Sequence, residues 1–138
     1  MLDANIQDQL RAYMERLAAP IELVASLDAR DKSGEMRTLL EQVAASSTQI
    51  TLRAGGSAAR TPSFAIGRTG EVARIHFAGL PMGHEFTSLI LALLQSGGHP
   101  PKVEAALIEQ IKSIKGTFKF ETFISLSCHN CPDVVQAL

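Results

Sequence analysis

The order of helical and extended segments most constrains what the chain can fold into. Apolar residues recur at helical spacing over residues 2–17, and the same spacing returns over 36–43 and 86–94. Between these segments lie short apolar or alternating stretches, bounded by proline, glycine and polar turns, that are typical of strands. The strands are expected at residues 21–27, 49–53, 63–66 and 71–77. The predicted order is therefore α, β, α, β, β, β, α.

The connections between the predicted strands restrict how they can pair. Strands 21–27 and 49–53 are joined through a helix and should be parallel, whereas the last two strands are joined by the turn Gly67–Gly70 and should form an antiparallel hairpin. We also predict that the peptide bond before Pro62, which leads into the third strand, is cis. This arrangement matches a thioredoxin-like fold of the α/β class.

The end of the chain repeats its beginning. A helix predicted over 103–114 is followed by a predicted strand over 118–126 and by the start of another helix. Ser125-Leu126, at the end of this strand, aligns with Ser26-Leu27 at the end of the first strand. Leu138 then falls partway along the second helix of the repeat. We therefore expect one complete thioredoxin-like copy followed by only the beginning of a second.

We place the boundary between the two copies in the stretch Gly97-Gly98-His99-Pro100-Pro101. Residues 1–98 are predicted to form the complete copy, and residues 99–138 the incomplete one. The strand predicted over 118–126 carries too much apolar surface for a solvated edge. We therefore expect either the first copy or a second chain to cover it.

Both cysteines of the chain, Cys128 and Cys131, lie where the strand of the second copy gives way to a predicted helix start. Unpaired N–H groups and the positive end of the helix dipole stabilise a thiolate at such a position. We expect Cys128 to be the exposed, attacking thiol and Cys131, a turn further into the helix, to be the more buried, resolving thiol. The first copy has Ala29 and Lys32 at the aligned positions, so we predict that it is redox-inactive.

Two other interpretations of the cysteine pair are open. The pair could be half of a structural zinc site completed by histidines, for which His84, His99 and His129 are the candidates. A second closely spaced cysteine pair, which zinc sites usually bring, is absent from the sequence. The pair could also be buried and inert, although inert core cysteines have no reason to flank a polar His-Asn dipeptide.

Glu85, at the start of the helix predicted over 86–94, is a further candidate catalytic residue. It is either a plain first-turn carboxylate favoured by the helix dipole or a proton acceptor for the resolving thiol. The second interpretation requires the first copy to supply the carboxylate across the interface, because the strand before Cys128 carries only Glu121. His129 is expected to be exposed, and either to pair with the Cys128 thiolate or to have no role.

Composition narrows the possible partners. The chain of 138 residues is 46% hydrophobic and 20% charged, which is typical of a globular protein of one domain or slightly more. With 13 basic and 14 acidic residues, one tyrosine and no tryptophan, nucleic acid is not an expected partner. We expect no membrane association, because no apolar run is long enough to span a bilayer, and a cytoplasmic location, because no export signal is visible. In that reducing compartment a lone cysteine pair is more often catalytic than structural.

Three segments of the sequence carry a resemblance to a known family. They are residues 78–89, residues 97–100 and the run Ser125-Leu126-Ser127-Cys128-His129-Asn130-Cys131-Pro132-Asp133-Val134-Val135-Gln136-Ala137-Leu138. With these segments the whole chain resembles the N-terminal domain of the family formed by the F subunit of alkyl hydroperoxide reductase. The run from Cys128 onward is the most specific part of the resemblance.

The resemblance implies a cytoplasmic bacterial flavoprotein disulfide reductase whose N-terminal domain contains two fused thioredoxin-like folds. In such a protein, electrons pass from NADH through FAD and a second dithiol to the pair that Cys128 and Cys131 match. They then pass to the disulfide of a partner peroxiredoxin, the C subunit of alkyl hydroperoxide reductase. The resemblance also implies a homodimer for the full-length protein.

The sequence departs from a complete reductase in one informative respect. No Gly-x-Gly-x-x-Gly motif is present, so we expect these 138 residues to bind neither FAD nor NADH themselves. We therefore predict a dithiol-disulfide transfer module, a disulfide oxidoreductase only as part of the larger enzyme. The alternative hypothesis is a non-catalytic docking domain, and thiol titration of Cys128 would separate the two.

Overall fold

The computed structural model describes all 138 residues. Its first part is built from the elements that the hydrophobic pattern predicts. These elements are α1 (Ala4–Met14), β1 (Ile21–Ser26), α2 (Asp31–Ala45), β2 (Ile50–Ala54), β3 (Ser63–Arg68), β4 (Ile75–Phe77), the 3-10 turn η1 (Gly83–Glu85) and α3 (Phe86–Ser96). The second part contributes only α4 (Ala105–Lys112) and α5 (Cys131–Ala137).

Local sequence signals determine where the first helix begins and which face it buries. The Asp3 side chain accepts a hydrogen bond from the Ile6 backbone N–H at 2.8 Å and so caps α1. Leu10 and Met14, one turn apart, are buried, as expected for the inner face of an amphipathic helix. This helix packs against α3, the last helix of the first copy in sequence.

The four strands form one mixed sheet in the order β2-β1-β3-β4. Strand β1 pairs with β2 in parallel and with β3 antiparallel, and β3 pairs with β4 antiparallel, which confirms the predicted pairing. The bond between Thr61 and Pro62 is cis, as predicted. Strand β4 is shorter than expected: it begins at Ile75, not at residue 71. The loop before it passes close to Gly67, where an added Cβ would lie 2.8 Å from the Ala73 Cα.

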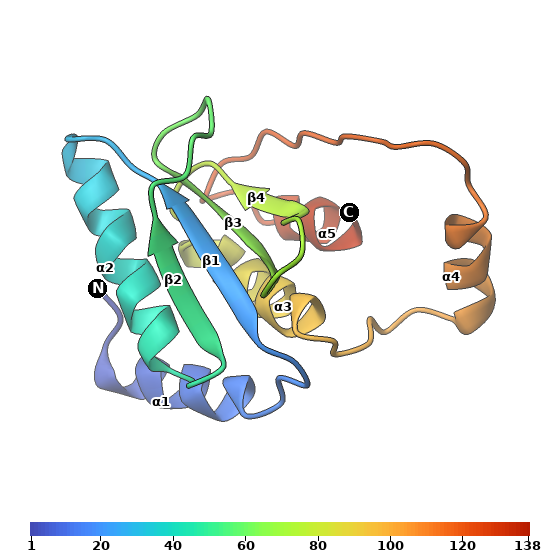
Figure 1. Cartoon of the computed structure of the whole chain (residues 1–138), viewed down its shortest axis with the longest axis horizontal. Helices are drawn as coiled ribbons and strands as arrows, with labels where there is room; N and C mark the ends of the chain where they lie inside the picture. Colours follow the sequence, from blue (N-terminus) through green and yellow to red (C-terminus); the bar gives the residue numbers. More distant parts are fainter.

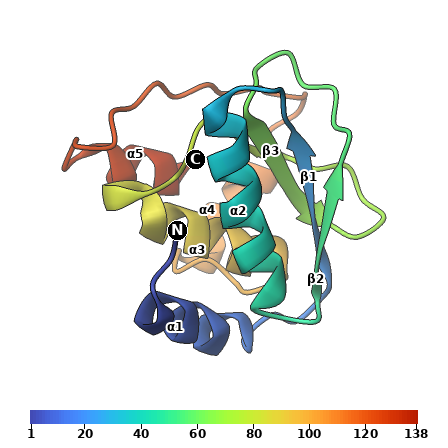
Figure 2. The same cartoon turned by 90° about the vertical axis from the view of Figure 1, so that its left-hand side faces the viewer.

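The helices of the first copy lie on one side of the sheet. Figure 2 shows the sheet nearly edge-on, with α1, α2 and α3 together on one side. A cluster of 19 buried apolar side chains fills the space between these two layers. Leu23, Leu39 and Leu89, one each from β1, α2 and α3, are completely buried within it. Burial of this kind is the main stabilising term for the fold.

The second copy departs from its prediction. Figure 1 shows α4 standing apart from the rest of the molecule, and the chain returning from it as a long extended segment. The prediction of a strand over 118–126 is wrong, because that segment has no strand conformation and no neighbour with which to form a ladder. A strand forms only where another strand satisfies its backbone N–H and C=O groups.

The apolar side chains of residues 118–126 remain uncovered. Phe118 is 61% exposed and Phe123 is 78% exposed. Arg60 makes two contacts with the segment, a cation–π contact 5.4 Å from the Phe123 ring centroid and an ion pair of 3.5 Å with Glu121. Of the two predicted alternatives, the first copy does not cover this segment, and coverage by a second chain stays a prediction. The division at residues 98 and 99 also stays a prediction.

The last helix returns to the first copy. Helix α5 packs against α3 and η1, and the Gln136 side-chain amide donates a hydrogen bond of 3.1 Å to the buried Ser88 hydroxyl of α3. The turn that carries both cysteines is thereby placed against the first copy. No helix in the structure combines the length and apolar character needed to cross a membrane.

Candidate redox site

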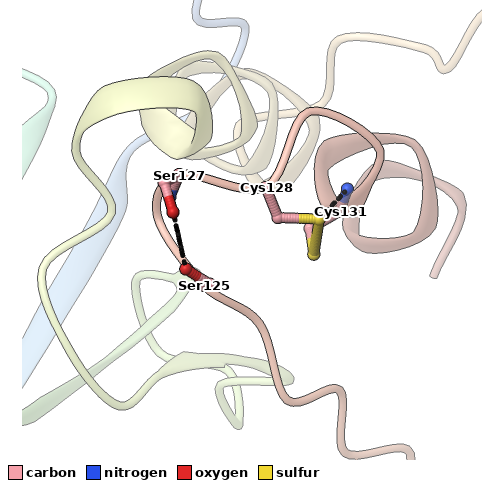
Figure 3. Close-up of a disulfide and its surroundings, with 4 residues drawn as sticks. All are labelled: Ser125, Ser127, Cys128 and Cys131. Carbon is pink, nitrogen blue, oxygen red and sulfur yellow. Dashed lines mark hydrogen bonds between the residues drawn. A yellow bond between two sulfur atoms is a disulfide. The ribbon is translucent and has the colours of Figure 1, made fainter.

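The two cysteines form a disulfide across a tight turn. Their Cα atoms are 5.5 Å apart, and both residues are half-buried. The Cys128 backbone N–H donates to the Ser125 carbonyl at 3.0 Å, and the Ser125 and Ser127 hydroxyls are 3.0 Å apart (Figure 3). The turn is therefore held by local hydrogen bonds as well as by the covalent bond.

The helix after the disulfide begins later than predicted. Helix α5 starts at Cys131, with Asn130 as its N-cap and Pro132 in its first turn. The expectation that Cys131 lies a turn inside the helix is therefore wrong, and Cys128 precedes the helix. No side chain caps the helix in the usual way; instead, the Cys131 backbone N–H donates to the Cys128 sulfur at 3.2 Å. That contact brings one N–H of the helix start to the Cys128 sulfur (Figure 3).

Cys128 and Cys131 are both half-buried, so Cys128 is not the fully solvent-exposed thiol that the sequence predicts. Cys131 is not deeply buried either, because it is the first residue of a helix that lies on the surface of the first copy. The hydrogen bond from Cys131 to the Cys128 sulfur still distinguishes the two sulfurs, since only that of Cys128 accepts a backbone N–H. The roles of attacking and resolving thiol stay predictions.

The first copy supplies the platform on which the redox turn rests. The rings of His84, in η1, and His129, between the two cysteines, have centroids 4.5 Å apart and are tilted by 58°. Gly83 has a φ of 59°, and a Cβ at this position would lie 3.3 Å from the Leu126 carbonyl oxygen. The platform consists of Gly83, His84 and Ser88, which contact the segment from Leu126 to Gln136.

Glu85 stands at the start of α3, as both interpretations of this residue require, and its side chain is buried. It is the last residue of η1, directly before α3, and it is only 1% exposed. Neither of its carboxylate oxygens has a hydrogen-bond partner. A buried carboxyl group without partners is costly to the fold, so this residue is unusual for a purely structural position. The role of proton acceptor stays a prediction.

The sequence did not predict the polar network at the matching corner of the first copy. The Asp28 carboxylate accepts hydrogen bonds from the Ser33 hydroxyl at 2.7 Å, the Thr61 hydroxyl at 2.8 Å and the Arg30 guanidinium at 2.7 Å. Arg30 also donates to the Thr61 carbonyl. Arg30, followed by Ser33, holds the pKa of the Asp28 carboxyl well below its ordinary range. In the sequence alignment of the two copies, Asp28 and Arg30 correspond to Ser127 and His129, beside and between the two cysteines.

The candidate zinc ligands are only partly brought together. His84 and His129 are in contact, whereas the His99 ring lies against the Pro100 carbonyl at 3.2 Å. No group of three or more histidine, cysteine, aspartate or glutamate side chains in the chain is arranged to hold a metal ion. The two cysteines are bonded to each other in this structure.

Comparison with known proteins identifies relatives along the whole chain. No protein-family model matches it. The alkyl hydroperoxide reductase F subunit of Pseudomonas aeruginosa is 59% identical over 138 residues, which are 100% of this chain and 26% of that protein. Over its whole length the chain is similar to alkyl hydroperoxide reductase F subunits. The F subunit of Escherichia coli K12 is 54% identical over 139 residues, covering 100% of this chain and 27% of that protein. The chain thus spans about a quarter of the length of these curated relatives.

Solved structures agree with the sequence relationship. The crystal structure of the NTD_N/C domain of the alkylhydroperoxide reductase AhpF from Enterococcus faecalis matches with a TM-score of 0.83 and 28% identity, over 99% of this chain and 72% of that chain. A protein disulfide oxidoreductase from Aeropyrum pernix shares the fold, with a TM-score of 0.80 at 21% identity over 99% of this chain and 66% of that chain. The predicted thioredoxin-like fold is therefore confirmed.

Proposed function

We propose that the chain is the dithiol-disulfide transfer module of a bacterial alkyl hydroperoxide reductase, the enzyme whose name its relatives carry. The observation that carries the proposal is the Cys128–Cys131 disulfide, held at a turn before a helix on a thioredoxin-like scaffold. A pair that closes over four residues at the surface can open and close without rearranging the core. The disulfide also gives no support to the alternative of a purely non-catalytic docking domain.

The proposed transfer proceeds in two exchanges. The Cys128 thiolate attacks one sulfur of the partner's disulfide, a bond forms between them, and the partner's second sulfur leaves as a thiolate. Cys131 then loses its proton and attacks the Cys128 sulfur. The Cys128–Cys131 disulfide forms, the partner's first sulfur is released, and two electrons have passed from this chain to the partner.

Glu85 is the proposed acceptor of the Cys131 proton. It belongs to η1, which packs against α5, the helix that begins with Cys131. Its oxygens make no hydrogen bond that would have to be broken before a proton is accepted. A base that accepts the proton of a thiol raises the rate at which the thiolate forms. The acceptor would therefore come from the first copy and the thiols from the second.

The source and destination of the electrons lie in other parts of the proposed system. The residues here do not fit a dinucleotide, because no Gly-x-Gly-x-x-Gly turn is present and the sheet is mixed, with its helices on one side. FAD and NADH are assigned to the reductase part of the full-length protein, which we propose to be a homodimer. The proposed partner is a peroxiredoxin, the C subunit of alkyl hydroperoxide reductase. The proposed location is the cytoplasm, where reducing conditions suit a dithiol carrier.

A trapping experiment tests the proposal and the two cysteine roles. Cys131→Ser should leave Cys128 able to attack a peroxiredoxin disulfide but unable to release it, so a covalent adduct should accumulate. Cys128→Ser should give no adduct. Intact-mass spectrometry under non-reducing conditions, followed by peptide mapping, locates the bond.

The outcomes separate the proposed roles from the proposed function. An adduct on Cys131 in the Cys128→Ser variant would make Cys131 the attacking thiol and Cys128 the resolving thiol, but both would still form the redox-active pair. If the reduced, unmodified chain exchanged with no disulfide substrate, the transfer function would be refuted and the docking alternative favoured.

A further inference from the structure

The contact between His84 and His129 has no part in the proposed transfer steps. Both rings are exposed, so core packing does not force them together. They nevertheless lie with their centroids 4.5 Å apart, one on the first copy and one in the turn between the cysteines. Aromatic rings at this separation attract each other through their edges and faces.

The surroundings of the pair show which groups act on it. On its own element, His84 is followed by the buried Glu85. From the opposing element, Asp133 stands in the first turn of α5. No ion pair joins either histidine to these carboxylates. The ring-to-ring contact is therefore the direct side-chain link between the first copy and the residues enclosed by the disulfide.

The importance of this contact depends on the redox state. In the oxidised chain, the covalent bond between Cys128 and Cys131 closes the turn. Reduction removes that bond and leaves only non-covalent restraints, among them the hydrogen bond from Cys131 to the Cys128 sulfur and the contact between the histidines. Attack of one thiol on its neighbour is fast only when the turn keeps the two sulfurs close together.

We propose that His84 is a positioning residue for the redox pair, which holds His129 and so keeps the reduced turn ready for Cys131 to attack Cys128. This inference rests on the proposed transfer function. It assigns His84 to the closing step, in which Cys131 displaces the partner's sulfur from Cys128. It does not assign His84 to the first attack by Cys128, which needs no second sulfur from this chain.

Reaction of the reduced full chain with an aromatic disulfide, 5,5′-dithiobis(2-nitrobenzoic acid), separates the two steps. The first coloured thiolate is released when Cys128 attacks, and the second when Cys131 closes the ring. Stopped-flow absorbance follows both. His84→Ala should slow the second phase by about 3- to 10-fold, as expected for loss of one side-chain contact. The first phase should change by less than about 2-fold.

Four further variants, the single His129→Ala substitution among them, make the test specific. His84→Phe, which keeps a ring at this position, should restore most of the closing rate. His84→Ala combined with His129→Ala should be no slower than either single variant, because both remove the same contact. His76→Ala, an exposed histidine on β4 with no assigned role, serves as the control and should leave both phases unchanged. The urea midpoint of each oxidised variant reports whether the fold is intact.

Several results would overturn the inference. An unchanged second phase in His84→Ala would do so, as would multiplicative effects of the two alanine substitutions or a failure of His84→Phe to restore the rate. Absence of any second phase in the unmodified chain would be a different failure, because it would refute the proposed transfer function and this inference with it. If the unmodified chain shows both phases and His84→Ala shows the same second-phase rate, this inference alone would be refuted and the transfer function would stand.

Discussion

Replacing the buried carboxyl group of Glu85 by an apolar side chain should stabilise the chain while slowing its thiol chemistry. Glu85 is 1% exposed and neither carboxylate oxygen has a hydrogen-bond partner. A buried polar group left unsatisfied costs about 1–3 kcal/mol. Leucine is of similar size and has no polar atom to satisfy, so Glu85→Leu should recover a cost of that order. The free energy of unfolding should therefore rise by about 1–3 kcal/mol.

Urea unfolding followed by circular dichroism provides the measurement. Small proteins lose about 1–3 kcal/mol of stability per molar urea, so the midpoint should move upward by an amount on the order of 1 M. Glu41→Leu, on the exposed face of α2, is the matched control and should change stability by no more than about 0.5 kcal/mol. Both variants should be compared in the oxidised form, in which the disulfide is intact.

The same variant tests the proposed proton acceptor. If Glu85 takes the proton of Cys131, ring closure in Glu85→Leu should be slower by about 100-fold, the lower end of the contribution made by general bases. A variant that is both less stable and equally fast would contradict the whole line of reasoning. If Glu85→Leu is more stable but closes the ring as fast as the unmodified chain, burial of Glu85 is costly as argued, but Glu85 is not the proton acceptor.

Two further predictions concern the corner of the first copy and the platform. The pKa of Asp28 is lowered in the folded chain, chiefly by Arg30, so its stabilising contribution is present above the unfolded-chain pKa of about 4 and is lost as pH falls further. Unfolding measured across that range should therefore depend less on pH in Asp28→Asn than in the unmodified chain, and parallel curves would contradict this. Gly83→Ala should lower the unfolding free energy by about 1–2 kcal/mol, because its φ of 59° disfavours a Cβ. The control Gly34→Ala, in a helix with open space around the new Cβ, should instead raise it by up to about 1 kcal/mol, and a loss at both sites would count against the conformational explanation.

The architecture of the first copy could be predicted because it depends on local patterns. The alternation of helical and strand periodicity, and the length of each connection, were enough to predict the mixed sheet and its parallel and antiparallel pairs. The family resemblance was likewise carried by contiguous runs of residues, above all the run that begins at Cys128. Each of these signals is present in a short stretch of the chain.

The strand predicted over 118–126 shows where local patterns stop being sufficient. Its apolar residues suit a strand, yet a strand needs neighbours for its backbone hydrogen bonds, and the segment has none in the structure. The start of α5 was misplaced for a related reason. A sulfur, which no capping rule includes, accepts the hydrogen bond of the first helical N–H.

By itself, the sequence determined the elements of the first copy, their pairing and the location of the thiols. Only the tertiary structure decided that Glu85 is buried without a partner, that His84 meets His129 and that Asp28 binds Arg30 and Thr61. These features join residues that lie far apart in the chain or depend on what packs around a side chain. Periodicity and spacing indicate which face of a helix or strand is apolar. They do not indicate which polar groups of different elements come into contact when the elements pack together.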